Sequence, residues 1–274
     1  MIAVLKVLSF AFLFIFSILS SQNPVIEDLK IGEKVTLNSK ILNEKRTLNI
    51  YLPQTFDKTK SYPVIYILDG SMNEDFLHLV GLQQFFNMQF KMPDFIIVGI
   101  ANVDRKRDFT FHTDLKDLQK DYPTTGHSDK FIEFVEKELQ PFINQNYKTE
   151  STRYLIGQSL GGLLATEILL KKPELFTHYF IISPSLWWDN ESLYNEASKL
   201  ISQQKDEERF VYISVGKNEH KMMVKEADGL YQILKNSGKK KLKLEYKLMT
   251  EDNHATILHK SVYEGFMKLF PYKE

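Results

Sequence analysis

Eight short β-like runs alternate with helix-like segments along the chain, and this alternation limits the possible folds more than any other feature. The later runs are almost continuously apolar, as expected for strands buried on both faces, whereas the first two are mixed and predict an antiparallel edge. The pattern predicts an α/β fold with a mostly parallel central sheet and helices on both faces. The runs are KVTLNS, TLNIYLP, YPVIYILDG, DFIIVGIAN, RYLIGQS, HYFIISPS, RFVYISVG and LKLEYKLM.

Two of the helix-like segments carry a clear apolar stripe. The first begins at Ser128, a residue type that caps helices, and the second follows Ser159 and ends before Pro173. The stripes consist of Phe131, Phe134, Val135, Leu139 and Phe142 in the first segment, and of Leu160, Leu163, Leu164, Ile168 and Leu169 in the second. No linker or repeat divides this region, so we expect a single domain.

The N-terminal residues have the pattern of a secretory signal peptide. Lys6 precedes an apolar run from Val7 to Leu19, and small polar residues follow. The run is shorter than the about 20 residues that a membrane-spanning helix needs. We expect a signal peptide over residues 1–21 and the α/β domain over residues 22–274, in a secreted or periplasmic protein without stable membrane insertion after cleavage. An uncleaved N-terminal anchor is the alternative.

Composition excludes several function classes. The 35 basic residues balance 35 acidic ones, so the net charge of zero gives no general attraction for nucleic acid. There are no cysteines, which rules out disulfides, thiolate metal sites and a cysteine nucleophile. No H-E-x-x-H or similar ligand spacing occurs either, so the sequence indicates no metal and no cofactor. Any nucleophile must be an oxygen or an amine.

Gly157, Ser159 and Gly161 form the pattern G-x-S-x-G between an apolar run and a helical stripe. In this pattern the serine occupies a sharp strand-to-helix turn, and the glycines avoid steric clashes across it. An ordinary Gly/Ser turn is the alternative interpretation. Because sites in parallel sheets form at the carboxyl ends of strands, Ser159 is a candidate nucleophile.

A serine nucleophile needs a base and an acid that orients this base, and the expected chain order is serine, acid, histidine. His254 lies between the last strand-like run and the last helical pattern, where it can reach back over the sheet. Glu219 follows the run that ends at Gly216 and is the favoured acid. Asp228 and Asp252 are the alternatives.

Six segments in this order resemble the putative esterase family of α/β-hydrolases, which includes esterases of enterobactin-type and bacillibactin-type siderophore trilactones. They are YPVIYILDG, RDFT, IGQSLGG, SPSLWWDN, VGKNE and NHATI, and the resemblance extends from about Val35 to Phe270. It implies an α/β-hydrolase fold and a catalytic relay of Ser159, Glu219 and His254. Members without a well-placed acid use serine and histidine alone, so a dyad stays open here.

The resemblance also implies an oxyanion hole and a substrate-binding arginine. The backbone N–H of Leu160 is one expected donor, and the backbone near Ser71 or Met72 supplies the second. Arg107 in RDFT is the closer match to the arginine of the family, and Arg105 is the alternative. Asp69 and Gly70 are expected to shape the loop after their strand.

Trp187 and Trp188 are candidates for an aromatic wall at the substrate site, with a buried packing role as the alternative. The segment between Ser183 and Phe210 is too short for a large cap domain, so we expect an open cleft for a small-molecule ester. The sequence therefore predicts a serine carboxylic-ester hydrolase that acts on siderophore trilactones or other bulky esters. An esterase of acylated sugars or plant-wall esters, or a non-catalytic ligand-binding relative, is the alternative.

Overall fold

The computed structural model describes residues 24–272. The predicted signal peptide, residues 1–21, lies outside these described residues. The chain divides into two units, Met1–Ile31 and Gly32–Glu274, and residues 24–31 of the first unit have no regular secondary structure. All helices and strands described below belong to the second unit.

The centre of this unit is an eight-stranded sheet with the strand order β1-β2-β4-β3-β5-β6-β7-β8. Strands β1 and β2 form an antiparallel pair, β2 is antiparallel to β4, and all other neighbours are parallel. The eight predicted strands, the mostly parallel sheet and its antiparallel edge are thus confirmed. The strands are β1 (Glu33–Ser39), β2 (Glu44–Tyr51), β3 (Tyr62–Ile67), β4 (Ile96–Ile100), β5 (Thr149–Gln158), β6 (His178–Ile182), β7 (Arg209–Gly216) and β8 (Leu242–Met249).

The burial of the strands agrees with their positions in the sheet. Every residue of β3, β4 and β7 is buried, which requires helices on both faces, whereas β1 alternates between exposed and partly buried residues as an edge strand does. The helices between the strands are α1 (Phe76–Phe90), α2 (Arg105–Phe109), α3 (Lys116–Asp121), α4 (Ser128–Phe134), α5 (Gln140–Asn146), α6 (Leu160–Lys171), α7 (Trp188–Gln203), α8 (Lys221–Lys235) and α9 (Ile257–Leu269).

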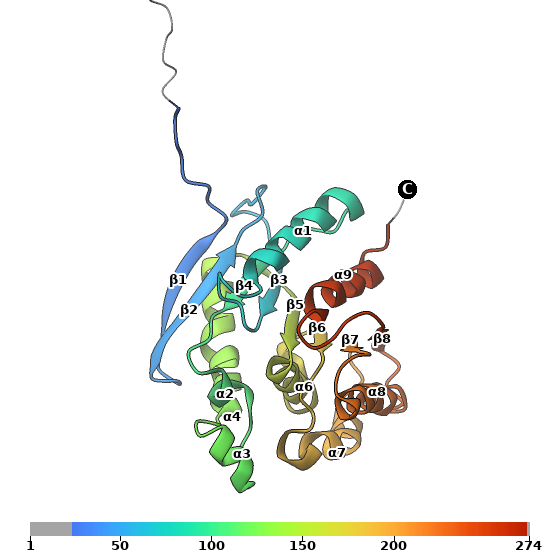
Figure 1. The fold of residues 1–274 in the computed structure, drawn as a ribbon. Coiled ribbons are helices and arrows are strands. Elements are labelled where there is room, and N and C mark those ends of the chain that lie inside the picture. The colour runs from blue at the N-terminus through green and yellow to red at the C-terminus, as the bar shows by residue number, and fades with distance from the viewer. Residues whose placement is uncertain (1–23, 273–274) are drawn as a thin grey trace, which may run out of the picture. The chain divides into compact units, whose positions relative to one another are not determined.

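The helices form two layers, one on each face of the sheet (Figure 1). Helices α1 and α9 cover one face, where Phe86 and Phe266 pack against strand residues such as Ile156. On the other face, α4, α6, α7 and α8 enclose a larger apolar core that includes Phe131 and Leu163. Both stripes predicted from the sequence thus face the core.

The local structure of the first striped segment differs from the prediction. The cap residue of α4 is His127, and Ser128 is already helical; its buried hydroxyl donates to Glu167 at 2.7 Å. The helix then widens into a π-turn, Val135–Leu139, before α5 begins. The predicted cap at Ser128 is wrong because a side chain from α6 binds its hydroxyl, and no local pattern indicates that contact.

Between β6 and β7 the chain forms only α7 and its flanking turns, so no large cap domain covers this end of the sheet. A short 3-10 turn, Pro173–Leu175, connects α6 to β6. No helix within residues 24–272 has both the length and the apolar character to cross a membrane.

A buried carboxyl lies between α7 and α8. Glu226 is 1 % exposed, and neither of its carboxyl oxygens meets a hydrogen-bond donor within residues 24–272. Burial, and then the neighbouring carboxyl of Glu191, raise the pKa of Glu226 to about 8. The unfolded chain loses this proton near the ordinary pKa of 4.5, whereas the folded chain keeps it. The folded state therefore loses stability as the pH rises from about 4.5 to about 8.

Replacing Glu226 with Gln removes the charge and keeps the size of the side chain. We expect the melting temperature of Glu226→Gln to exceed that of the wild type by about 5 °C near pH 8.5, with a much smaller difference near pH 5. Thermal unfolding at both pH values measures this. Asp228→Asn, an exposed position on the same helix, is the control and should change little. An equal gain for Glu226→Gln at both pH values would contradict the assignment.

Candidate functional site

Ser159 forms the turn between the end of β5 and the start of α6. Its backbone has φ 62° and ψ −119°, a conformation that residues with a Cβ rarely adopt. The turn also requires Gly157, because a Cβ there would lie 2.4 Å from the carbonyl oxygen of Gly161. The predicted sharp turn is confirmed, and its strain is typical of functional sites.

The backbone of Ser159 is held from both sides. Its N–H donates to the carbonyl of Ile182 at 3.0 Å, and its own carbonyl accepts from the N–H of Ser185 at 3.1 Å. The Ser159 hydroxyl lies 3.4 Å from the Ser185 hydroxyl. Leu160 begins α6, so its N–H belongs to the first turn, where backbone donors have no partner inside the helix.

Glu219 and His254 lie beyond the carboxyl ends of the next strands along the sheet. Glu219 follows β7, His254 follows β8, and Nδ1 of His254 lies 2.7 Å from Oε2 of Glu219. The Glu219 side chain is fully buried, whereas that of His254 is 45 % exposed. A Cβ at Gly216 would lie 2.6 Å from the carbonyl of Asp252, so only glycine lets these two loops approach so closely.

The carboxylate of Glu219 is held by three donors. Besides His254, the Ser183 hydroxyl donates to Oε1 at 2.5 Å and the N–H of Gly216 donates to the same oxygen at 2.7 Å. Burial by itself raises the pKa of Glu219, but the hydrogen bonds from His254, Ser183 and Gly216 outweigh it, so this pKa lies below 4.5. Glu219 is therefore an anion at neutral pH, hydrogen-bonded to the imidazole.

The loop that carries His254 is attached to the serine turn. Nε2 of Gln158 donates to the carbonyl of His254 at 2.5 Å. In the part of the chain that the structure describes, the imidazole binds Glu219 and the Ser159 hydroxyl contacts Ser185, so the serine–histidine hydrogen bond is not formed. Such bonds are often long without substrate, and this geometry does not argue against a base at His254.

The two alternative acids lie elsewhere. Asp252 is buried, accepts from the Thr256 hydroxyl at 3.0 Å and pairs with Lys260 at 3.2 Å. Asp228 is exposed on α8. Of the three candidate carboxylates, Glu219 is the one that contacts His254.

The loop after β3 approaches the serine turn through Asp69. This residue has φ 57° and accepts hydrogen bonds from Asn102 at 2.6 Å and from Arg105 at 2.7 Å. The N–H of Ser71 donates to Glu74 at 3.2 Å, and Met72 is 47 % exposed. Of the two predicted donors on this loop, the N–H of Ser71 is thus already engaged.

Both predicted arginines form salt bridges. Arg105 binds Asp69 through two nitrogens, and Nη2 also donates to the carbonyl of Gln158 at 3.2 Å, so its guanidinium lies against the serine turn. Arg107 binds Glu44 at 2.7 Å and Asp108 at 2.8 Å. Both side chains are partly exposed, and substrate binding by either arginine stays a prediction.

The tryptophans occupy different environments. Trp188 is fully buried, and its indole N–H donates to the carbonyl of Phe111 at 3.0 Å. The prediction that Trp188 contacts substrate is therefore wrong, and the alternative of a packing role applies. Trp187 is only half-buried and lines a surface groove together with Leu118 and Met222.

Sequence reasoning missed three side chains next to the candidate catalytic residues: Gln158, Ser183 and Ser185. Ser183 has φ 43° and binds Glu219, Ser185 contacts Ser159, and Gln158 binds the backbone of His254. Their position at or just past the carboxyl ends of β5 and β6 was visible in the sequence. Serine and glutamine are common in turns, however, so residue type alone did not distinguish them.

The strand order, the strained serine turn after β5 and the acid and histidine after β7 and β8 define the chain as an α/β-hydrolase. Within this class, residues 39–271 match the family described as "Putative esterase", and the chain belongs to that family. The resemblance found in the sequence is thereby confirmed.

Individual relatives agree with this family. The ferri-bacillibactin esterase of Bacillus subtilis (strain 168) is 29% identical over 241 residues, which cover 79% of this chain and 82% of that protein. An IroE-like serine hydrolase from Shewanella oneidensis has a TM-score of 0.80 at 29% identity, covering 87% of this chain and 80% of that one. The BES protein from Bacillus cereus has a TM-score of 0.78 at 29% identity, covering 92% of this chain and 100% of that one.

Proposed function

We propose that the protein is a serine carboxylic-ester hydrolase that works through an acyl-enzyme, with Ser159 as nucleophile, His254 as base and Glu219 as the acid that orients it. The observation that carries this proposal is the buried, ionised Glu219 bound to His254 beside the strained turn at Ser159. The carboxylate of Glu219, bound to Nδ1 of His254, keeps the imidazole proton on that nitrogen. Nε2 is then left to accept the proton of Ser159.

The reaction takes place in two halves. As Ser159 Oγ attacks the ester carbonyl, its proton moves to Nε2 of His254; the alcohol then takes this proton as the C–O bond breaks and the acyl-enzyme forms. A water molecule next gives a proton to His254 and attacks the acyl carbonyl. The acid is released, and the proton returns to Ser159. The Glu219 carboxylate stabilises the imidazolium in both halves.

The negative charge on the carbonyl oxygen needs fixed donors. The N–H of Leu160 is suited to this role because it begins α6 directly after the nucleophile, where backbone donors and the helix dipole favour an anion. For the second donor, the N–H of Met72 is the better candidate, because the N–H of Ser71 donates to Glu74.

Siderophore esters are the substrate class that we propose. The supporting observations are the family and the similarity to an esterase named for ferri-bacillibactin. The alternatives are esters of acylated sugars or plant-wall material, or a ligand-binding protein without turnover. Incubation with a ferric catecholate trilactone and with acetylated or feruloylated oligosaccharides separates these possibilities by the product released.

For its location, we propose secretion after removal of the N-terminal signal peptide. The support is the apolar run from Val7 to Leu19 followed by small polar residues. We expect mass spectrometry of the protein from its native cells to show a mature chain that begins near Gln22, in a fraction outside the cytoplasm. An intact Met1 in the membrane fraction would instead indicate an uncleaved anchor.

The nucleophile is tested by Ser159→Ala. The wild type should hydrolyse p-nitrophenyl acetate or butyrate, and Ser159→Ala should lose this activity because no other group forms the acyl-enzyme. The substitution removes one hydroxyl, so the melting temperature should change little. Turnover is measured by release of p-nitrophenol. Wild-type rates in Ser159→Ala would exclude a serine hydrolase that uses this residue.

The acid is tested by Glu219→Gln. This change keeps the shape of the side chain but removes the charge that stabilises the imidazolium, so kcat should fall by about 100-fold or more while KM changes little. Asp252→Asn is the matched control, because Asp252 is also buried but binds Thr256 and Lys260. A collapse of kcat in Asp252→Asn alone would mean that the acid is misassigned. Normal kcat in both variants would indicate a serine–histidine dyad.

A further inference from the structure

A surface groove of about 510 Å³ lies between α3 and the starts of α7 and α8. We refer to it as the Trp187 groove. Its volume is in the range of small-molecule binding sites. Its apolar lining is Leu115, Leu118, Trp187 and Met222, and its polar lining is Lys116, Asp117, Asn190 and Glu191.

Two short segments of the chain connect residues of the Trp187 groove to contacts of the candidate catalytic residues. Ser185 contacts the Ser159 hydroxyl, and Trp187 follows two residues later. Glu219 binds His254, and Met222 follows three residues later. Because consecutive Cα atoms are 3.8 Å apart, the Cα atom of Trp187 lies within about 8 Å of that of Ser185, and the Cα atom of Met222 within about 11 Å of that of Glu219. Two further cavities, of about 340 and 330 Å³, lie near Arg209 at the start of β7, away from these residues.

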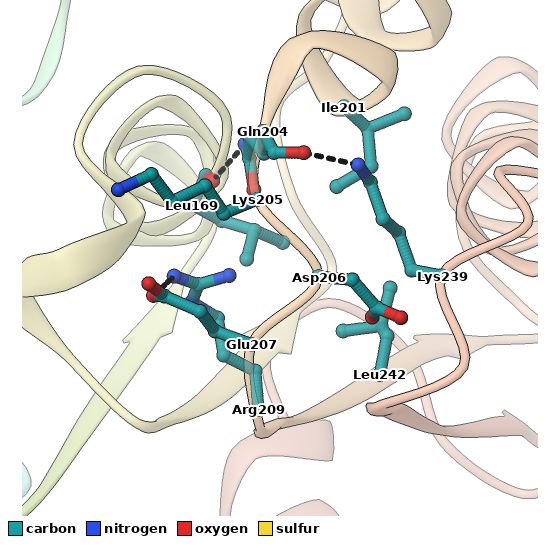
Figure 2. A pocket seen from close by; sticks show the side chains of 9 residues that line it. All are labelled: Leu169, Ile201, Gln204, Lys205, Asp206, Glu207, Arg209, Lys239 and Leu242. Atoms are coloured by element: carbon teal, nitrogen blue, oxygen red, sulfur yellow. Dashed lines mark hydrogen bonds and ion pairs between the residues drawn. The ribbon is translucent and has the colours of Figure 1, made fainter.

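A much smaller cavity of about 10 Å³ also lies at that opposite end of the sheet (Figure 2). Its lining groups are bound to one another: Gln204 donates to the carbonyl of Leu169 at 2.8 Å, and Arg209 pairs with Glu207 at 2.8 Å. Neither its size nor its side chains suit an ester substrate.

Two hydrogen bonds connect two of the segments that line the Trp187 groove. The indole N–H of Trp188 donates to the carbonyl of Phe111, and the Thr113 hydroxyl donates to Asp189 at 2.6 Å. Both bonds connect the segment before α3 to the start of α7. The groove is therefore a preformed feature rather than a gap between mobile loops.

The wall at the start of α7 has an unusual backbone. Asp189, Asn190 and Glu191 have φ values of 53°, 52° and 59°, three consecutive left-handed residues without a glycine. This conformation is unfavourable for residues with a Cβ and persists only where surrounding contacts impose it. Here Asp189 accepts hydrogen bonds from Thr113 and Ser192. The strain is concentrated beside the groove, as is common at binding sites.

The Trp187 ring is fixed by aromatic neighbours. Its centroid lies 6.0 Å from that of Trp188 and 6.4 Å from that of Tyr122. An indole that is held in place and half-buried loses little conformational entropy on binding and offers a flat apolar surface. Leu118 and Met222 add flexible apolar contacts along the same groove. This lining fits a planar aromatic group better than a sugar or a linear polar chain.

From these contacts we infer that the Trp187 groove binds an aromatic group of the ester substrate and sets the preference of the enzyme for aryl-bearing esters. This inference rests on the proposed esterase function, because the groove acts as a subsite next to Ser159. The aromatic group belongs either to the acyl part or to the alcohol part of the ester, and the experiment tests each in turn.

The experiment compares kcat/KM for two pairs of esters. Ethyl 3-phenylpropanoate and ethyl butyrate differ in the acyl part, and benzyl acetate and ethyl acetate differ in the alcohol part. We expect Trp187→Ala to lower kcat/KM about tenfold for the aryl ester of one pair, with little effect on its alkyl partner. Trp187→Phe keeps an aromatic face and should restore most of the loss. Titration of acid release at constant pH measures all four rates.

Two further variants complete the test. Met222→Ala removes an exposed side chain of the groove. It should give a smaller loss of kcat/KM, again for the aryl ester and not for its alkyl partner. This variant also tests the inference if Trp187→Ala folds poorly. Met88→Ala, an exposed methionine on α1, is the control and should change none of the rates. Equal effects on aryl and alkyl esters in both groove variants would overturn the inference. If the wild type hydrolyses none of the four esters, the esterase proposal fails as well, whereas turnover with equal effects on aryl and alkyl esters overturns only the role of the groove.

Discussion

The tight turn at Ser159 is the constraint on which the arrangement of the site depends. Strand β5 stays in the sheet up to Gln158, and α6 begins one residue after the serine, so the reversal is confined to Ser159 itself. Backbone bonds to Ile182 and Ser185 occupy its N–H and its carbonyl. These bonds fix the start of the next loop as well. The serine turn and the wall of the Trp187 groove are therefore parts of one hydrogen-bonded unit.

A second constraint is the burial of a charge at Glu219. A buried carboxylate is costly unless donors surround it, and Ser183, the N–H of Gly216 and His254 provide them. Gly216 is the last residue of β7 and Ser183 directly follows β6, so the carboxyl ends of two strands fix the direction of the carboxylate. The imidazole is thus oriented by a fully buried carboxylate, although 45 % of its own side chain is exposed. Such rigidity suits a proton relay, because errors in position weaken it strongly.

The sequence predicted those features that depend on local patterns. Six apolar runs and two mixed ones indicated all eight strands, and the positions of Ser159, Glu219 and His254 after strands placed them at one end of the sheet. It failed where a distant contact decides the outcome. Ser128 is not a cap because Glu167 binds its hydroxyl, and Trp188 is buried with its indole N–H donated to the backbone carbonyl of Phe111. No period or motif encodes such contacts, and the left-handed turn that begins at Asp189 has no glycine to reveal it.

The ion pairs near the site argue that its selectivity depends more on shape than on charge. Arg105 forms a salt bridge with Asp69, and Arg107 forms one with Glu44. Glu44 also forms a second salt bridge, with Arg46. Burial raises the pKa of Glu44, but hydrogen bonds from Arg107 and Arg46 outweigh it and hold this pKa below its ordinary value. Glu44 therefore stays ionised. An anionic substrate would have to compete with these carboxylates for either arginine. A planar group that stacks on Trp187 does not compete with these ion pairs, because the half-buried indole lines a groove that leaves space for a ligand.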